Sequence, residues 1–214
     1  MKQLTIQEVV EATKASTRGP LTGKILGVSV DSRTLQAGEL FVPLAGENFD
    51  GHDFIPMAFG KGAAACLCDE RRWEDILPQT RGKSLLFVKN PLEALMDLSI
   101  YYRRQFGIPF IAITGSVGKT TTKDMIAQIL EEKYVVLKNQ GNFNNEIGLP
   151  LTLFNLDDHH QVCIVEMGMR GLGEIRKLSK AVLPKVAVIT NIGISHIERL
   201  HSKQNIAQAK LEIL

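Results

Sequence analysis

Four short, uninterrupted apolar runs in the second half of the chain constrain its fold most strongly. They lie at residues 110–113, 134–137, 162–165 and 186–190. Such runs, rich in valine and isoleucine, suit strands that are buried on both faces of a parallel sheet. Helical patterns lie between them, at residues 120–133, 148–154 and 173–181. The alternation predicts an α/β domain with a mostly parallel sheet.

The first half of the chain predicts a second, smaller domain of mixed α/β type. Its strand-like runs lie at residues 24–30, 40–44, 63–68 and 85–88. A helical pattern follows at 91–106, and its first turn holds Pro91, where a proline is tolerated. Gly107 and Pro109 then break the pattern. We therefore predict an N-terminal domain over residues 1–107 and a central domain over residues 108–214.

Composition excludes several classes of protein. The 214 residues carry 25 basic and 23 acidic side chains, a balance of +2 that is too near neutral for a nucleic-acid or membrane surface. There is no signal-peptide pattern and no apolar run long enough to cross a bilayer. The cysteines, Cys66, Cys68 and Cys163, form no C-x-x-C pair, which argues against a disulfide framework and a structural zinc site. We expect a protein of the reducing cytoplasm.

A candidate phosphate-binding loop follows the first of the four apolar runs. It joins a predicted strand to a predicted helix and consists of Gly115, Ser116, Val117, Gly118, Lys119, Thr120 and Thr121. Backbone N–H groups would face a phosphate, Lys119 would neutralise its charge and Thr120 could ligate Mg²⁺. The full P-loop pattern needs glycine where the chain has Ile113. The alternative is a glycine turn with an exposed lysine.

More polar residues follow the other runs, and in a parallel sheet they would meet at the same edge. Glu166 ends the third run and is a candidate Mg²⁺ ligand, although acids at strand ends are often only solvated. Asn191 and His196 follow the fourth run, and a lone histidine is more often structural. The segment NQGNFNNEIGLP, residues 139–150, could bind phosphate or substrate through its amides, or could simply be a turn.

Lys210 lies in an unexpected place on the last predicted helix, residues 202–214. Ser202 is a plausible N-cap of this helix. One face is apolar and holds Ile206, Ala207, Leu211, Ile213 and Leu214, and the opposite face holds Gln204, Gln208 and Glu212. Lys210 falls near the middle of the apolar face. Either its amine extends to water past packed methylenes, or the amine points into the active site with a lowered pKa.

Together, these motifs resemble the Mur ligases of peptidoglycan synthesis. The matching segments are GSVGKTT, GNFNNEIGLPLTL, EMGMRGLGEI, TNIGISHIE and IAQAK in the second half, and DSRTLQAGELFVPLAGENFDGHDFI in the first. The resemblance is closest to the members that join D-alanyl-D-alanine to UDP-N-acetylmuramoyl-tripeptide. The shortened phosphate loop is the usual form in this family, so the resemblance favours a nucleotide site.

The resemblance also implies roles for individual residues. The loop Gly115 to Thr121 would contact the phosphates of ATP, with Asn144 and Asn145 beside it. Catalysis would depend on Lys119, Lys210 and His196. The Mg²⁺ ligands would be Thr120, Glu166, His196 and Lys210, the last as a carbamate. Asp31, Ser32 and Arg33 would contact the uridine nucleotide, or could be only a polar turn. The chain departs from the family at His201 and Leu211, where glycines are usual or frequent.

The implied activity is an ATP-dependent amide-bond ligation through an acyl phosphate, by a protein that we expect to be monomeric. The alternatives are a sister Mur ligase, a folylpolyglutamate synthase or a non-catalytic nucleotide-binding module. A doubly wound sheet needs more than the four predicted central strands. We therefore expect the central domain to be incomplete and the chain to be part of a longer enzyme, inactive in ligation by itself.

Overall fold

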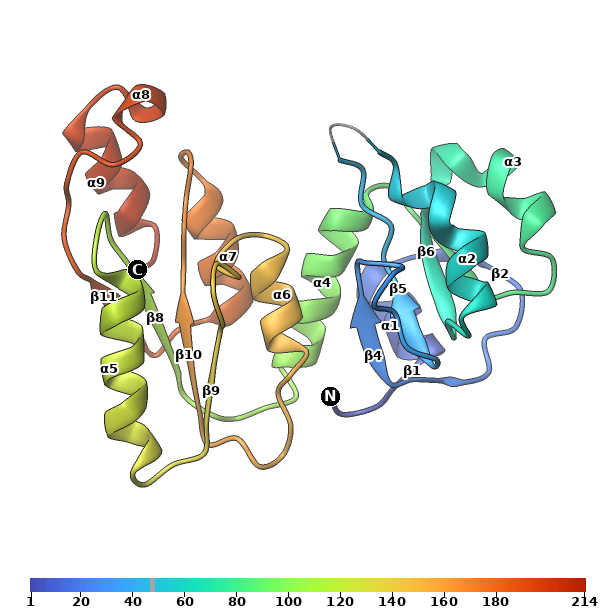
Figure 1. Ribbon diagram of the computed structural model, residues 1–214, viewed down its shortest axis with the longest axis horizontal. Helices are drawn as coiled ribbons and strands as arrows, with labels where there is room; N and C mark the ends of the chain where they lie inside the picture. Colours follow the sequence, from blue (N-terminus) through green and yellow to red (C-terminus); the bar gives the residue numbers. More distant parts are fainter. Residues whose placement is uncertain (47–48) are drawn as a thin grey trace. The chain divides into compact units, whose positions relative to one another are not determined.

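The structure, a computed structural model, describes residues 1–46 and 49–214 (Figure 1). It divides into two compact units, residues 1–101 and 102–214. The division falls inside helix α4 (Pro91–Arg103), earlier than the predicted boundary after Gly107. Glu47 and Asn48, which belong to the N-terminal segment that resembles the Mur ligases, lie outside the described residues. Across the described ranges, no helix has the length and apolar character needed to span a bilayer.

The first unit is built on a five-stranded sheet in the order β2-β7-β6-β5-β4. These strands are β2 (Ser16–Arg18), β7 (Leu85–Val88), β6 (Ala65–Asp69), β5 (Glu39–Phe41) and β4 (Gly27–Ser29). Strands β4 to β7 are parallel, and β2 pairs antiparallel with β7. The short helices are α1 (Ile6–Thr13), α2 (Ile55–Gly60) and α3 (Trp73–Ile76). The predicted α/β character of this half is confirmed.

One predicted strand of the first unit is in fact two. The run 24–30 divides into β3 (Lys24–Ile25), which pairs with β1 (Leu4–Thr5), and β4, which pairs with β5. The break falls at Leu26, whose side chain is exposed. The chain passes from one sheet to the other at this residue, so a continuous apolar run did not mean a continuous strand.

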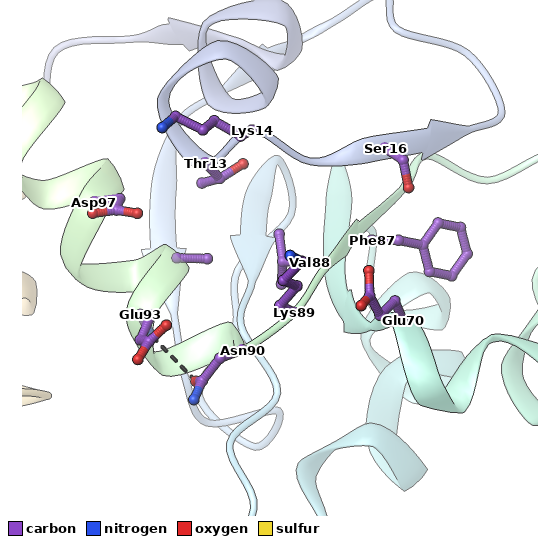
Figure 2. A pocket seen from close by; sticks show the side chains of 11 residues that line it. Thr13, Lys14, Ser16, Glu70, Phe87, Val88, Lys89, Asn90, Glu93 and Asp97 are labelled. Atoms are coloured by element: carbon purple, nitrogen blue, oxygen red, sulfur yellow. Dashed lines mark hydrogen bonds between the residues drawn. The ribbon is translucent and has the colours of Figure 1, made fainter.

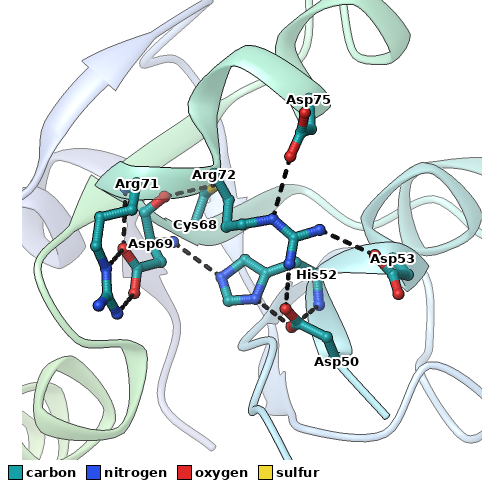
Figure 3. Close-up of polar contacts among 8 residues, drawn as sticks. All are labelled: Asp50, His52, Asp53, Cys68, Asp69, Arg71, Arg72 and Asp75. Atoms are coloured by element: carbon teal, nitrogen blue, oxygen red, sulfur yellow. Dashed lines mark hydrogen bonds and ion pairs between the residues drawn. The ribbon is translucent and has the colours of Figure 1, made fainter.

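A buried histidine ties the end of β6 to the short 3₁₀ helix Gly51–Phe54 (Figure 3). The Nε2 of His52 accepts a hydrogen bond from the backbone N–H of Asp69 at 2.9 Å. Its Nδ1 therefore carries the proton and donates to Asp50 at 2.6 Å. Arg72 donates to the other oxygen of Asp50 and, at 3.1 Å, to Asp53. The network anchors the FDGHDFI part of the segment that resembles the Mur ligases.

The second unit is built on four parallel strands in the order β11-β8-β10-β9. They are β11 (Val186–Ile189), β8 (Phe110–Thr114), β10 (Val162–Glu166) and β9 (Val136–Lys138). The helices are α5 (Lys119–Glu131), α6 (Gly148–Leu153), α7 (Glu174–Val182), α8 (Ile197–Leu200) and α9 (Lys203–Leu211). Every residue of β10 is buried. The predicted parallel sheet is confirmed, but the predicted burial on both faces is wrong for the two edge strands: β9 and β11 are only partly buried, and β9 begins two residues after the start of the predicted run.

The apolar face predicted for the last helix is partly wrong. Ser202 does cap α9, since its hydroxyl accepts from the N–H of Asn205 at 3.1 Å, and Lys210 is buried as its position indicated. Leu211, however, is 48% exposed, although the pattern placed it inside. Glu212, predicted on the opposite face, has a side chain only 4% exposed. The reason is that α9 meets α7, whose first turn needs a hydrogen-bond acceptor.

Glu212 supplies that acceptor. Its carboxylate receives the N–H of Gly173 at 2.8 and 2.9 Å and the N–H of Arg176 at 3.2 Å. The first N–H groups of a helix have no partner inside the helix, and a negative charge there is favourable. The side chain of Glu212 therefore fixes α9, two residues beyond Lys210, to the beginning of α7.

We predict that Glu212→Ala lowers the free energy of unfolding by about 1–2 kcal/mol, because the N–H groups of Gly173 and Arg176 lose their acceptor. Arg176→Ala is the matched control, since the guanidinium of Arg176 is exposed and lies 3.6 Å from Glu212. A long ion pair whose cation is exposed to water contributes less than about 1 kcal/mol. Urea denaturation of both variants measures the difference. Equal losses would show that the ion pair, and not the cap, stabilises this junction.

Candidate functional site

The candidate site lies at the carboxyl edge of the four-stranded sheet. Strands β8, β10 and β11 are parallel, and β8 lies between the other two, so the segments that follow them meet. A cavity of about 640 Å³ is lined by residues from these segments, from the asparagine-rich segment and from α9. The predicted site residues among them are Gly115, Lys119, Asn144, Asn145, His196 and Lys210. A cavity of this size suits a nucleotide-sized ligand.

Two glycines give the loop its shape. Gly115 has φ 153°, and a Cβ placed there would lie 1.9 Å from the hydroxyl oxygen of Thr190, so a side chain cannot be accommodated. Gly118 has φ 80° and is the N-cap of α5. Ile113, where the full P-loop pattern has glycine, is a buried residue of β8 that packs in the core under α5. The glycine motif begins only at Gly115 because β8 continues through Ile113 to Thr114.

Asn191 holds the loop from the neighbouring strand. Its Oδ1 accepts the N–H groups of Ser116 and Val117, each at 3.0 Å. Thr190 donates to the carbonyl of Val117 at 2.6 Å. Within residues 1–46 and 49–214, no side chain caps the first turn of α5. The N–H groups at the start of α5, near Thr120, are thus the donors left for a phosphate.

Glu166 is held with both carboxylate oxygens engaged. Thr120 donates its hydroxyl to Oε2 and Asn144 donates its amide to Oε1, each at 2.7 Å. Glu166 is only 3% exposed. Lys119 donates to the carbonyl of Gly115 at 3.0 Å, which places its amine over the loop.

A hydroxyl beside a buried carboxylate is a donor set that suits Mg²⁺. This ion prefers oxygen ligands and usually takes one or two carboxylates, with phosphate and water completing its coordination. Among the described residues there is no group of three or more His, Cys, Asp or Glu side chains that could hold a metal by themselves. Thr120 and Glu166 therefore fit an Mg²⁺ that arrives with a nucleotide.

Lys210 lines the cavity, although the residue is only 1% exposed. Burial, and secondarily the positive charge of Lys119, lowers the pKa of this amine to about 8. His196 lines the same cavity with φ 65°, a left-handed conformation that few non-glycine residues adopt. His201 has φ 64°, so the chain keeps the turn for which the resembling family uses glycine.

Three further cations line the cavity and were not singled out from the sequence: Arg170, Lys177 and Arg199. With Lys119 and Lys210 they outnumber the two acidic residues of the lining, Glu146 and Glu174, so the site is positive, as a polyphosphate ligand requires. Arg170 follows β10 in the EMGMRGLGEI segment, and that position after a parallel strand was the signal that could have found it; Lys177 lies just beyond this segment, on α7.

Asp31, Ser32 and Arg33 lie in the first unit, after β4. Arg33 is paired with Asp31 at 2.7 Å, and its hydrogen bonds lower the pKa of Asp31 to about 2. Lys61 donates to the backbone carbonyls of Ser32 and Arg33 at 2.8 and 2.9 Å. The turn is therefore well ordered, and its contact with a uridine nucleotide stays a prediction.

The first unit holds a cavity of its own, of about 430 Å³ (Figure 2). Lys14 and Asp97 face it from one side, and Glu70 and Lys89 from another. Burial raises the pKa of Asp97 above its usual value. Asn90 caps α4 by accepting the N–H of Leu92 at 2.9 Å. The side chains that line this cavity carry charges of both signs. The sequence did not indicate the cavity.

The strand, glycine loop, helix and buried acid define an α/β domain of the phosphate-loop class. A family model described as "Mur ligase middle domain" matches residues 113–214, and one described as "Mur ligase family, catalytic domain" matches residues 24–103. The chain belongs to the Mur ligase family.

Individual relatives agree with this assignment. A UDP-N-acetylmuramoyl-tripeptide–D-alanyl-D-alanine ligase of Bacillus subtilis (strain 168) is 43% identical over all of this chain and 46% of its own length. A crystal structure of MurF from Acinetobacter baumannii has a TM-score of 0.89 at 34% identity, over all of this chain and 46% of that one. MurF ligase from Thermotoga maritima, in complex with ADP, has a TM-score of 0.79 at 33% identity, over 87% and 42%. The chain spans less than half the length of these relatives.

The lowered pKa of Lys210 predicts a pH-dependent reactivity. An amine reacts with a small acylating reagent only when it is neutral, so acetylation of Lys210 should rise with a midpoint near pH 8, well below the value of about 10.4 for an ordinary lysine. Lys119→Ala should shift the midpoint upward, because it removes the neighbouring positive charge. Mass spectrometry of acetylated peptides across a pH series measures both. A midpoint near 10 in the parent protein would contradict the buried position of the amine.

Proposed function

We propose that the complete protein is an ATP-dependent ligase that joins D-alanyl-D-alanine to UDP-N-acetylmuramoyl-tripeptide in the cytoplasm. The observation that carries this proposal is the buried Glu166 carboxylate bonded to Thr120 at the start of the phosphate-loop helix. Lys119 and Lys210 face the cavity beside it. The names of the relatives and the ADP complex of one of them support the same activity.

The chain's residues suit the first half of such a reaction. The terminal carboxylate of the tripeptide would attack the γ-phosphorus of ATP and release ADP, leaving an acyl phosphate. Lys119 and the first turn of α5 would stabilise the charge on the transferred phosphoryl group. The amine of D-alanyl-D-alanine would then attack the acyl carbon, lose a proton and expel phosphate. Most of the catalysis in this scheme is positioning and charge neutralisation.

Mg²⁺ would be held by Thr120 and Glu166, and His196 and carbamylated Lys210, which line the cavity, would be further ligands. When bound, Mg²⁺ would neutralise phosphate charge and orient the γ-phosphoryl group. Lys210 suits carbamylation because its lowered pKa leaves a useful fraction of neutral amine, which can add to CO₂ with loss of a proton. The carbamate would turn a buried cation into an anionic oxygen ligand.

The assignment to D-alanyl-D-alanine is tested by a direct comparison of substrates. The complete protein is incubated with ATP, Mg²⁺ and either UDP-N-acetylmuramoyl-tripeptide plus D-alanyl-D-alanine, or the substrates of a sister Mur ligase or a folylpolyglutamate synthase. Only the first pair should give product. Binding of ATP without turnover of any pair would instead favour a non-catalytic nucleotide-binding module. Light scattering in the same buffer tests the proposed monomer.

Lys119→Ala should weaken ATP binding and abolish release of ADP in the complete protein, because the charge beside the phosphates is lost. Lys180→Ala is the control, since Lys180 is exposed on α7 and does not line the cavity. Calorimetric titration with ATP and a coupled ADP assay measure the two effects. Turnover in Lys119→Ala at the rate of the control would show that this loop is not the phosphate site.

Lys210→Ala should lose activity and regain part of it when a short carboxylic acid such as acetate is added, because the acid can occupy the place of the carbamate. Bicarbonate should give no rescue, since no amine remains to react with CO₂. Initial rates with increasing acetate or bicarbonate distinguish the two. Full activity of Lys210→Ala without any addition would show that the lysine only packs.

A further inference from the structure

Asn139, at the end of β9, is a buried residue whose side chain bonds to the backbone of Glu166. It is 1% exposed. Its Oδ1 accepts the N–H of Glu166 at 2.9 Å, and its Nδ2 donates to the carbonyl of Glu166 at 3.1 Å. The paired backbones of β9 and β10 end at Lys138 and Ile164. Beyond this point, the side chain of Asn139 takes the place of the β9 backbone and bonds both the N–H and the carbonyl of Glu166.

The same amide also holds the loop that carries Asn144. Its Nδ2 donates to the carbonyl of Phe143 at 2.9 Å. Asn144 follows directly, and its own carbonyl accepts the N–H of Gly168 at 2.8 Å. Asn139 thus fixes both the residue that presents the carboxylate and the loop whose amide bonds to Oε1 of that carboxylate.

Lys123 completes the arrangement from α5. It is 3% exposed, and its amine donates to the carbonyl of Asn139 at 2.8 Å. Lys123 lies one helical turn after Lys119 and Thr120, so it ties the helix that begins at the phosphate loop to the end of β9. A lysine is seldom buried to this extent without a specific partner. The contact therefore fixes the position of α5 relative to the ends of β9 and β10.

We propose that Lys123 and Asn139 are positioning residues for the metal-binding carboxylate: together they hold Glu166 so that its oxygens face Thr120 and Asn144. This inference rests on the proposed function, in which Glu166 binds Mg²⁺. Neither residue is part of the cavity lining. Residues that orient metal ligands in this way typically change metal affinity by about 10–100-fold when they are replaced.

The test is the binding of Mn²⁺, an Mg²⁺ substitute that is visible by electron paramagnetic resonance, to the complete protein with ADP. Asn139→Ala and Lys123→Met should each weaken Mn²⁺ binding about tenfold or more. Their affinity for ADP in the presence of EDTA should stay that of the parent. If the two residues only stabilised the fold, their replacement would weaken the binding of Mn²⁺ and of ADP together.

Matched controls are available on the same unit. Asn155→Ala replaces an exposed asparagine, just after α6, whose side chain donates to the carbonyl of Leu151, and Lys180→Met replaces an exposed lysine. Neither should change Mn²⁺ binding. Asn139→Asp is the second variant at the central position, in case the alanine variant does not fold. Aspartate keeps the acceptor for the N–H of Glu166, but it places an oxygen where the amide donated to the carbonyls of Phe143 and Glu166. Because these two hydrogen bonds are lost, Mn²⁺ binding should again weaken.

Glu166→Gln distinguishes failure of the positioning role of Lys123 and Asn139 from failure of the proposed metal site. If it loses Mn²⁺ while folded Asn139→Asp and Lys123→Met bind Mn²⁺ like the parent, the positioning role is wrong and the metal role of Glu166 stands. If Glu166→Gln itself binds Mn²⁺ like the parent, the proposed metal site is wrong and the positioning role falls with it. Loss in all of these variants, with the two controls unchanged, is the expected result.

Discussion

The parallel pairing of β8 with β10 is the constraint on which the candidate site depends. It places Glu166 opposite Ile113, at the point where the chain leaves β8 for the phosphate loop. Only with this register can the hydroxyl of Thr120, at the start of α5, reach the carboxylate at 2.7 Å. A shift of one residue would turn the glutamate to the other face of the sheet. The loop, the acid and the helix N-terminus therefore form one unit and not three separate motifs.

Electrostatics then determine what this arrangement can hold. Lys119, Lys210 and three further cations line the cavity and outnumber its two acidic residues, Glu146 and Glu174. The side chains that donate to the buried carboxylate of Glu166, Thr120 and Asn144, are neutral. A site with this charge is suited to a polyphosphate that brings its own divalent cation. The buried amine of Lys210 is costly to keep charged, which is why its pKa falls to about 8. In the proposed function, the same cost leaves neutral amine that can react with CO₂.

Hydrogen-bonded amides, more than apolar packing, give the loops of the site their shape. Asn191 clamps the phosphate loop, Asn144 holds the carboxylate, and Asn139 holds the strand end beneath it. Each amide combines a donor and an acceptor on a short side chain, so it can bridge backbone groups where a strand or helix has ended. The segment 139–150, whose composition is that of a polar turn, is therefore a structural part of the site.

The sequence alone determined the parallel sheet of the second unit, the loop and its glycines, and Glu166 at a strand end, because each depends on local spacing or on uninterrupted apolar runs. It placed Lys210 on an apolar helix face but left open whether the amine reaches water. The tertiary structure alone decided that Leu211 is exposed while Glu212 is buried, that the run at 24–30 is two strands, and that Asn139, Lys123 and Asn191 hold the site together. These features depend on contacts between segments distant in the chain. A local pattern records how often a residue type recurs, and it contains no information about which backbone groups elsewhere lack a partner.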